Sequence, residues 1–346
     1  MPEPIKISSR RVWMHKGVVD PDFGAMHVLS DNPWQFVELY LTRAKSRDAL
    51  DYWKQARRFA EAAAQMSAES APLAVYYSFL NASKALLCHK KVEHGDRHGV
   101  AGDRAENARA SLANEKVKFQ NGGVLPSLCK YFNETAVATE LSLRDILWNL
   151  PFIHRAFCLS FTSATDLFIP LERACYVRHD NTKEAWFQAE IVPRFSDQRT
   201  LKSLPSSFET WEDNGKTLVR RKKRFEWYIG RTAPDQKTLA TKRLKNYHAT
   251  TRRIIVSISG DRDLWYLKKE VKSNPAAGRH TLTLMFAAMH RLSELSRYDP
   301  GGLDRHLSGQ ANWLLVEFIN HSLGQFIDQI ASEVTGLQFW PPKMRS

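Results

Sequence analysis

Hydrophobic positions recur at helical spacing towards both ends of the chain and alternate at strand spacing in its middle. Apolar residues every three or four positions predict helices with one buried face. We expect helices at Trp34–Met66, Leu73–Lys91, Leu125–Asn133, Ser142–Phe168, Ala233–Asn246, Arg279–Arg297 and Gln310–Thr335. Asn32 can cap the first helix and Pro33 suits its first position. The triplet Ser46-Arg47-Asp48 and the imino acid Pro151 are expected to interrupt helices.

The pattern changes after Pro170, where β-branched and aromatic residues dominate. We expect strands at Ala174–His179, Ala185–Val192, Thr217–Gly230, Arg252–Ser259 and Leu264–Lys268. Turn formers separate these segments, which indicates an antiparallel sheet. Residues 1–30 are expected to form an extended arm or short strands, and residues 93–123 two loops around a short helix.

These elements predict a mainly helical α+β protein. Residues 1–170 would form an N-terminal helical region, residues 171–278 a basic, β-rich insert, and residues 279–346 the helices that complete a bundle. The chain has 346 residues, enough for one large domain or two ordinary ones.

Composition favours a cytoplasmic protein without a membrane segment. No window reaches 18 consecutive apolar residues, and the first residues lack the apolar centre of a signal peptide. The four cysteines are widely spaced and form no Cys-x-x-Cys pair, so we expect free, buried thiols. The sequence has no P-loop and no dinucleotide-binding, zinc-protease or nucleophile-elbow motif, so we predict no cofactor and no metal.

The charge of the chain is +13 and is concentrated in one stretch. Residues 216–279 contain 18 Lys and Arg but only 5 Asp and Glu, which accounts for the whole excess. A local cationic patch predicts a polyanionic partner. We expect a nucleic acid or a nucleotide, with an acidic protein as the alternative.

The run from Arg220 to Arg224 lies inside a predicted strand, so alternate cations should face opposite sides of the sheet. Aromatic residues nearby in the sequence could stack on bases. The nucleic-acid-binding residues we predict are Arg220, Arg221, Lys222, Lys223, Arg224, Lys242, Arg243, Lys245, Arg252 and Arg253. The alternative is that the aromatics fill the sheet core while the cations keep an edge soluble.

Titratable groups are densest at His89, His94 and His98 with Asp96. They could contact a phosphate at the end of a helix, hold a metal through imidazole and carboxylate groups, or lie in a solvated loop. The residues alone leave these three readings open.

The segment Ala74–Val100 resembles the HEPN families of bacteria. The matching residues are Tyr76, Tyr77, Lys84, Ala85, Leu86, Leu87, His98, Gly99 and Val100. This resemblance implies a helical bundle that often dimerises, and a role in stress response or phage defence. HEPN ribonucleases carry Arg-x-x-x-x-His on a bundle helix, where His acts as acid or base and Arg stabilises developing charge.

That spacing occurs here at Arg10–His15 and Arg243–His248, neither of which lies in a predicted bundle helix. In the bundle helix, Lys84–His89 has the spacing but Lys replaces Arg, and Lys lacks the planar fork of guanidinium. We therefore predict a non-catalytic binding protein. The alternative is a metal-independent ribonuclease that uses His89 or His98 as acid or base, with Lys84 or Arg97 stabilising charge.

The segment Met285–Phe339 is similar to YaaC-like proteins. The similarity rests on an apolar helix ending in Ser296-Arg297-Tyr298-Asp299-Pro300, followed by a long closing helix. The two resemblances together identify a YaaC-like protein with a HEPN-like helical segment.

Overall fold

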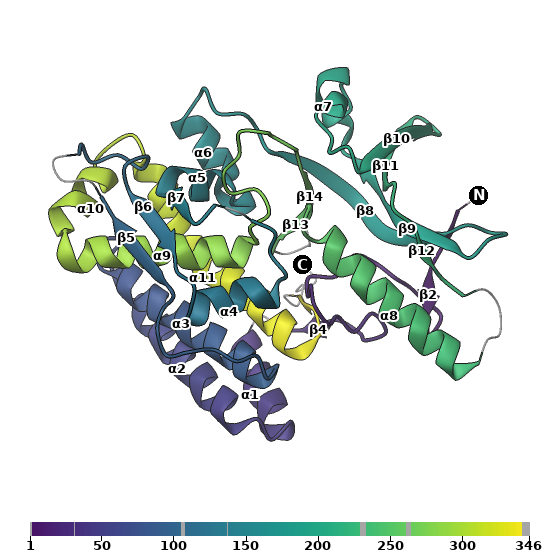
Figure 1. Ribbon diagram of the computed structural model, residues 1–346, viewed down its shortest axis with the longest axis horizontal. Coiled ribbons are helices and arrows are strands. Elements are labelled where there is room, and N and C mark those ends of the chain that lie inside the picture. The colour runs from purple at the N-terminus through teal and green to yellow at the C-terminus, as the bar shows by residue number, and fades with distance from the viewer. Residues whose placement is uncertain are drawn as a thin grey trace, which may run out of the picture. The chain divides into compact units, whose positions relative to one another are not determined.

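The computed structural model describes residues 2–30, 32–104, 108–136, 138–228, 233–260 and 264–340. It has an α+β architecture with several antiparallel sheets, as expected (Figure 1). The chain forms two compact units. We call residues 1–29, 167–272 and 336–346 the sheet unit, and residues 30–166 and 273–335 the helical unit. These boundaries differ from the three predicted segments, because the arm and the last residues belong with the sheet.

The helical unit contains most of the expected helices. They are α1 (Pro33–Arg43), α2 (Arg47–Ala63), α3 (Ala71–His89), α4 (Val124–Tyr131), α5 (Leu143–Trp148), α6 (His154–Ser160), α9 (Thr281–Tyr298), α10 (Pro300–Leu307) and α11 (Asn312–Thr335). Both predicted breaks are confirmed. The chain turns between α1 and α2 at residues 44–46, and the 3-10 turn Pro151–Ile153 separates α5 from α6.

Helix α3 is the centre of the helical unit. It packs against α2, α4, α9 and α11, because apolar side chains occur on nearly every side of it. The rings of Phe79 on α3 and Phe326 on α11 stack with centroids 3.9 Å apart. A helix that is apolar all round is stable only when it is surrounded in this way.

Three expectations for the helical unit are wrong. The expected helix Ser142–Phe168 ends with α6 at Ser160, and residues 161–167 are not helical. Residues 93–123, expected to form loops and a helix, contain β5 (Val100–Asp103) and β6 (Lys116–Phe119), which join β7 (Glu140–Ser142) in a small antiparallel sheet. These strands are too short to show a clear alternation. Helix α9 ends where expected, but helix α10, which directly follows it, was not predicted. Asp299 caps α10 by accepting the Gly302 N–H at 2.9 Å.

The sheet unit is built on an eight-stranded antiparallel sheet. Its strands are β1 (Glu3–Pro4), β8 (Phe168–Arg178), β9 (Glu184–Ile191), β10 (Phe208–Asp213), β11 (Lys216–Arg221), β12 (Phe225–Glu226), β13 (Ile255–Ile258) and β14 (Leu264–Lys268). The order is β10-β11-β9-β8-β14-β13, with β1 paired to β8 and β12 to β9.

Several features of this unit differ from the prediction. Strand β8 begins at Phe168 and not at Ala174, and β13 begins at Ile255 and not at Arg252. Strand β10 was not expected, and the expected strand Thr217–Gly230 divides into β11 and β12, with residues 229–230 outside the described part. Helix α8 (Pro234–Thr251) is longer than expected. The short helix α7 (Gln198–Lys202) and the 3-10 turn Pro193–Phe195 follow β9.

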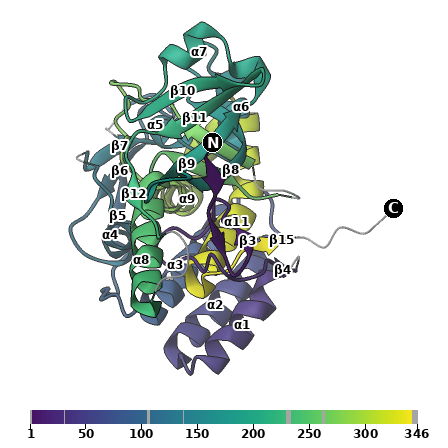
Figure 2. The ribbon, with the colours of Figure 1, turned by 90° about the vertical axis from the view of Figure 1, so that its right-hand side faces the viewer.

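The arm adds short strands from both ends of the chain. Strands β2 (Lys6–Ile7) and β3 (Arg10–Arg11) form a hairpin, while β4 (Val28–Leu29) pairs in parallel with β15 (Phe339–Trp340). The backbone of the arm also bonds to β8, since the Met14 N–H donates to the Ala174 carbonyl at 2.9 Å. The arm is therefore part of the sheet unit and extends it (Figure 2).

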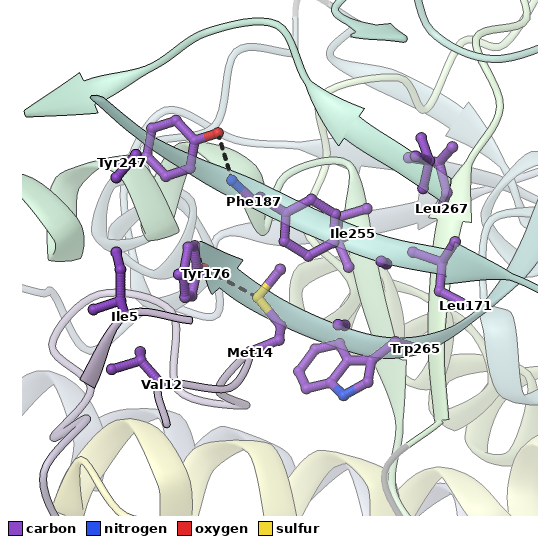
Figure 3. Close-up of a cluster of buried hydrophobic side chains, with 14 of the residues drawn as sticks. Ile5, Val12, Met14, Leu171, Tyr176, Phe187, Tyr247, Ile255, Trp265 and Leu267 are labelled. Carbon is purple, nitrogen blue, oxygen red and sulfur yellow. Dashed lines mark hydrogen bonds between the residues drawn. The ribbon is translucent and has the colours of Figure 1, made fainter. Parts of the chain in front are cut away.

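One face of the sheet, here called the inner face, holds the core of this unit. Alternate residues of β8 and β9, among them Tyr176 and Phe187, pack there against Leu244 and Tyr247 of α8. Figure 3 shows Val12 and Met14 of the arm in the same cluster. Because side chains alternate along a strand, the intervening residues must point to the opposite, outer face.

Candidate nucleic-acid interface

The predicted catalytic residues lie in the helical unit but do not form one site. The Tyr76 hydroxyl lies 2.5 Å from Nδ1 of His98. Lys84 lies 4.0 Å from the carboxylate of Asp96. His89, in contrast, packs edge-on against Tyr40 with ring centroids 5.6 Å apart.

The closest neighbour of this cluster that the sequence analysis missed is His290 on α9. Its ring lies 4.9 Å from Tyr76 and 5.9 Å from His98. Burial lowers the pKa of His98 and lowers that of His290 to about 3, while it raises the pKa of Tyr76. These three groups are therefore neutral near pH 7, and the hydrogen bond between Tyr76 and His98 joins two of them.

The cavity of the helical unit has other walls. It holds about 630 Å³ between two loops, Gly95–Arg97 and Gln120–Gly123. Neither His98 nor His89 lines it. Among the described residues, no three His, Cys, Asp or Glu side chains are arranged to hold a metal ion.

The predicted nucleic-acid-binding residues belong to the sheet unit, where they have three different environments. Arg221 and Arg252 are buried. Arg220, Arg224, Arg243 and Lys245 each pair with a carboxylate. Lys222, Lys223, Lys242 and Arg253 are exposed and have no carboxylate partner in the part of the chain that the structure describes.

Arg221 shows why burial was not foreseen. It pairs with Phe208 across β10 and β11, and its side chain turns to the inner face. There its guanidinium donates to the hydroxyls of Thr250 and Thr251, both at 2.8 Å, at the end of α8. Burial lowers the pKa of this guanidinium. The predicted alternation holds for Arg220 and Arg221, but β11 ends there and residues 222–224 lie outside a strand. The sequence could not show which side of the sheet would be covered.

The outer face of the sheet carries arginine side chains stacked on tryptophan rings. The guanidinium of Arg220 lies 4.8 Å from the ring of Trp211 and 5.8 Å from that of Trp186. Arg224 lies 4.7 Å from Trp186, and Arg11 of the arm lies 4.2 Å from Trp13. These tryptophans and Arg11 were not among the predicted binding residues. The alternation along β8 and β9 was the signal that could have identified Trp186.

Carboxylates neutralise this face only in part. Glu209 accepts from both Arg220, at 2.6 Å, and Arg224, at 3.0 Å. Glu190 is shared in the same way by Arg173 and Lys216. Each carboxylate faces two cations, so a positive charge remains at each pair.

Charge over the whole chain follows the division into units. The sheet unit contains 29 of the 50 Lys and Arg but 16 of the 37 Asp and Glu, which gives it the entire net charge of +13. The helical unit is neutral by the same count. The excess predicted for residues 216–279 is therefore a property of the folded sheet unit.

The fold defines an α+β protein with a neutral helical unit and a cationic sheet unit. A family model described as YaaC-like protein matches residues 29–334, which include nearly all of the helical unit and residues 167–272 of the sheet unit. The chain belongs to the YaaC-like protein family. Comparison with curated proteins and with solved structures finds no significant match. No helix within the described ranges is both long enough and apolar enough to cross a bilayer.

Proposed function

We propose that this protein binds single-stranded nucleic acid on the outer face of its eight-stranded sheet, without cleaving it. The observation that supports this most is the arginine–tryptophan stacking at the exposed Trp13 and the half-buried Trp211, while the buried ring of Trp186 lies beneath Arg220 and Arg224. Proteins that hold single strands combine cations along a groove with aromatic rings on which bases stack. A duplex offers no free base faces, so this arrangement favours a single strand.

Unsatisfied polar atoms on the same face support the proposal. Buried side-chain atoms of Arg11, Trp186 and Gln188 have no hydrogen-bond partner among the described residues. Such atoms cost free energy unless something pairs with them. Phosphate oxygens accept hydrogen bonds from guanidinium and indole groups, and exocyclic base amines can donate to an amide oxygen.

Binding without cleavage is proposed because His89 and His98 contact different side chains and neither lines a cavity described above. A HEPN-like bundle around α3 remains part of the proposal, supported by the central position of this helix with Tyr76 and His98. Incubation of labelled RNA with the wild type and with His98→Ala should show no cleavage by either. If the wild type cleaves the RNA and His98→Ala does not, the protein is a ribonuclease and the proposal of binding without cleavage is wrong.

Fluorescence anisotropy with labelled 20-nucleotide RNA, single-stranded DNA and duplex DNA tests the binding proposal. We expect the single strands to bind at 50 mM salt and more weakly at 200 mM, with a slope of about −0.7 per phosphate contacted. Trp211→Ala should weaken binding by roughly 5-fold or more, since one base stack contributes about 1–3 kcal/mol.

Matched variants separate the outer face from charge in general. The substitution Arg220→Gln removes an outer-face cation, while Arg58→Gln removes an exposed cation of the neutral helical unit. A third variant, Lys222→Gln with Lys223→Gln, tests the exposed part of the predicted run. Equal affinity of Arg220→Gln, Trp211→Ala and wild type, or no binding at low salt, would overturn the proposal.

A further inference from the structure

The arm encloses a cavity of about 520 Å³ whose described walls all belong to the sheet unit. Its lining includes Arg10, Arg11, Trp13, His15 and His27. Cavities of this size hold small ligands, and the polar groups in them decide which ligand is bound. Neither the family nor the predicted binding residues assign a role to this cavity.

Two guanidinium groups give the cavity its charge. Arg10 is exposed, and Arg11 donates to the thiol sulfur of Cys175 at 3.0 Å. Within the described part of the chain, neither arginine pairs with a carboxylate. The cavity has one acidic group, Asp22, and one of its oxygens already accepts the N–H groups of Gly24 and Ala25.

His15 adds a neutral donor to the cavity wall. Its Nδ1 accepts the N–H of Gly17 at 2.9 Å, so the proton of the neutral ring lies on Nε2. Burial lowers the pKa of His15 to about 3, so the ring stays neutral near pH 7. His15 lines the cavity although it is only 4% exposed.

Aromatic rings complete the lining. Trp13 is 42% exposed although it is a large apolar side chain. Val12 and Met14, its neighbours in sequence, point into the core in Figure 3, so Trp13 and Arg11 point the other way. His27 stacks on Trp340 with ring centroids 4.9 Å apart. A planar base can therefore lie against an exposed indole beside two guanidinium groups.

We propose that this cavity binds a terminal phosphate monoester of a nucleotide, with the phosphate on Arg10, Arg11 and His15 and the base on Trp13. A phosphate monoester carries a charge of about −1.5 to −2 at pH 7, which two guanidinium groups match better than they match a singly charged diester. The inference rests on the proposed function where the nucleotide ends a strand, because Arg11 and Trp13 belong to both the cavity and the outer face. A free nucleotide has the same chemistry.

The test compares one 20-nucleotide single-stranded RNA with a 5′-phosphate, with a 3′-phosphate and with hydroxyl groups at both ends. We expect one phosphorylated strand to bind about 10-fold more tightly than the hydroxyl strand, equivalent to about 1.4 kcal/mol. Arg10→Gln should abolish this preference without changing affinity for the hydroxyl strand. Lys6→Gln is the control, because Lys6 is the exposed cross-strand neighbour of Arg11 and does not line the cavity.

Calorimetric titration with adenosine monophosphate and with adenosine tests the free nucleotide. Binding of the monophosphate alone, lost in Arg10→Gln, supports the cavity even if no strand binds. Strands that bind equally well with and without phosphate, together with no heat from the monophosphate, would overturn this inference and leave the proposed function standing. Failure of the hydroxyl strand to bind would instead remove the proposed function.

Discussion

Adjacent residues of the same type can have opposite roles in this protein. Arg220 reaches the outer face, where its side chain is 34% exposed and pairs with Glu209. Arg221, the next residue, is 8% exposed and donates to Thr250 and Thr251. One step along a strand exchanges the two faces, so equal charge does not imply equal function.

Replacing each of these arginines by alanine should separate stability from binding. Arg221→Ala removes the donor to the half-buried Thr250 hydroxyl and the buried Thr251 hydroxyl. We therefore expect the free energy of unfolding to fall by about 2–3 kcal/mol. Arg220→Ala should lower it by less than about 1 kcal/mol, since an exposed ion pair contributes little. Urea unfolding measures both, and equal losses would contradict this account.

The buried neutral histidines make stability depend on pH. Burial lowers the pKa of His290 to about 3, while the unfolded chain titrates near 6.5. Between these values the unfolded state binds more protons, so the stability that His290 contributes falls as the pH falls below about 6.5. We expect wild type to lose about 1–2 kcal/mol more than His290→Gln between pH 7 and pH 5, measured by urea unfolding. Parallel losses in both proteins would exclude His290 as a source.

At the scale of elements, the β2–β3 hairpin shows local strain beside the cavity. Ser8 and Ser9 form its turn with φ of 49° and 66°, a conformation that favours glycine or asparagine. The same hairpin presents Arg10 and Arg11 to the cavity. Strained backbone often occurs where a functional side chain must be held in place.

Ser9→Gly should relieve this strain. We expect the sheet unit to gain about 0.5–1 kcal/mol, because glycine adopts positive φ without a Cβ clash. A thermal unfolding scan should show a higher midpoint. Ser196→Gly is the control, since Ser196 has a φ of −89° and glycine there should lower the midpoint. A lower midpoint in both variants would show that the turn is not strained.

For the whole molecule, the sheet unit depends on residues from both ends of the chain. Phe339 is 3% exposed, and its backbone carbonyl accepts from the buried Lys16 ammonium at 3.2 Å. The side-chain oxygen of Gln338 accepts the Lys16 N–H at 3.0 Å. The last described strand therefore fixes the arm that surrounds the cavity.

Phe339→Ala should loosen the arm. Loss of a buried phenyl ring costs about 3–5 kcal/mol. We expect hydrogen exchange to accelerate at the amides of β4 and of residues 12–18, while the amides of α3 in the helical unit keep their protection. Leu29→Ala is the control, because Leu29 lies in the paired strand with its side chain 73% exposed. Uniform acceleration in α3 as well would show that the two units unfold together.

The sequence determined the class and position of most long elements, because helical periodicity and capping act over neighbouring residues. It predicted α3 and α11, the break before α2 and strand β14 for that reason. It did not predict β5, β6 or β10, because Ala, Gly, Asp, Lys and Glu, which are depleted in strands, make up half or more of these segments.

The candidate site was decided only by the tertiary structure. Local composition located the charge, but pairing of β10, β11 and β9 decided that Arg220 faces outward and Arg221 inward. The walls of the cavity combine residues of the arm with Gln338, more than 300 positions away in the chain. No pattern among neighbouring residues predicts that these segments lie together. Charge and periodicity are properties of neighbouring residues, whereas burial and the walls of a cavity depend on which segments pack together.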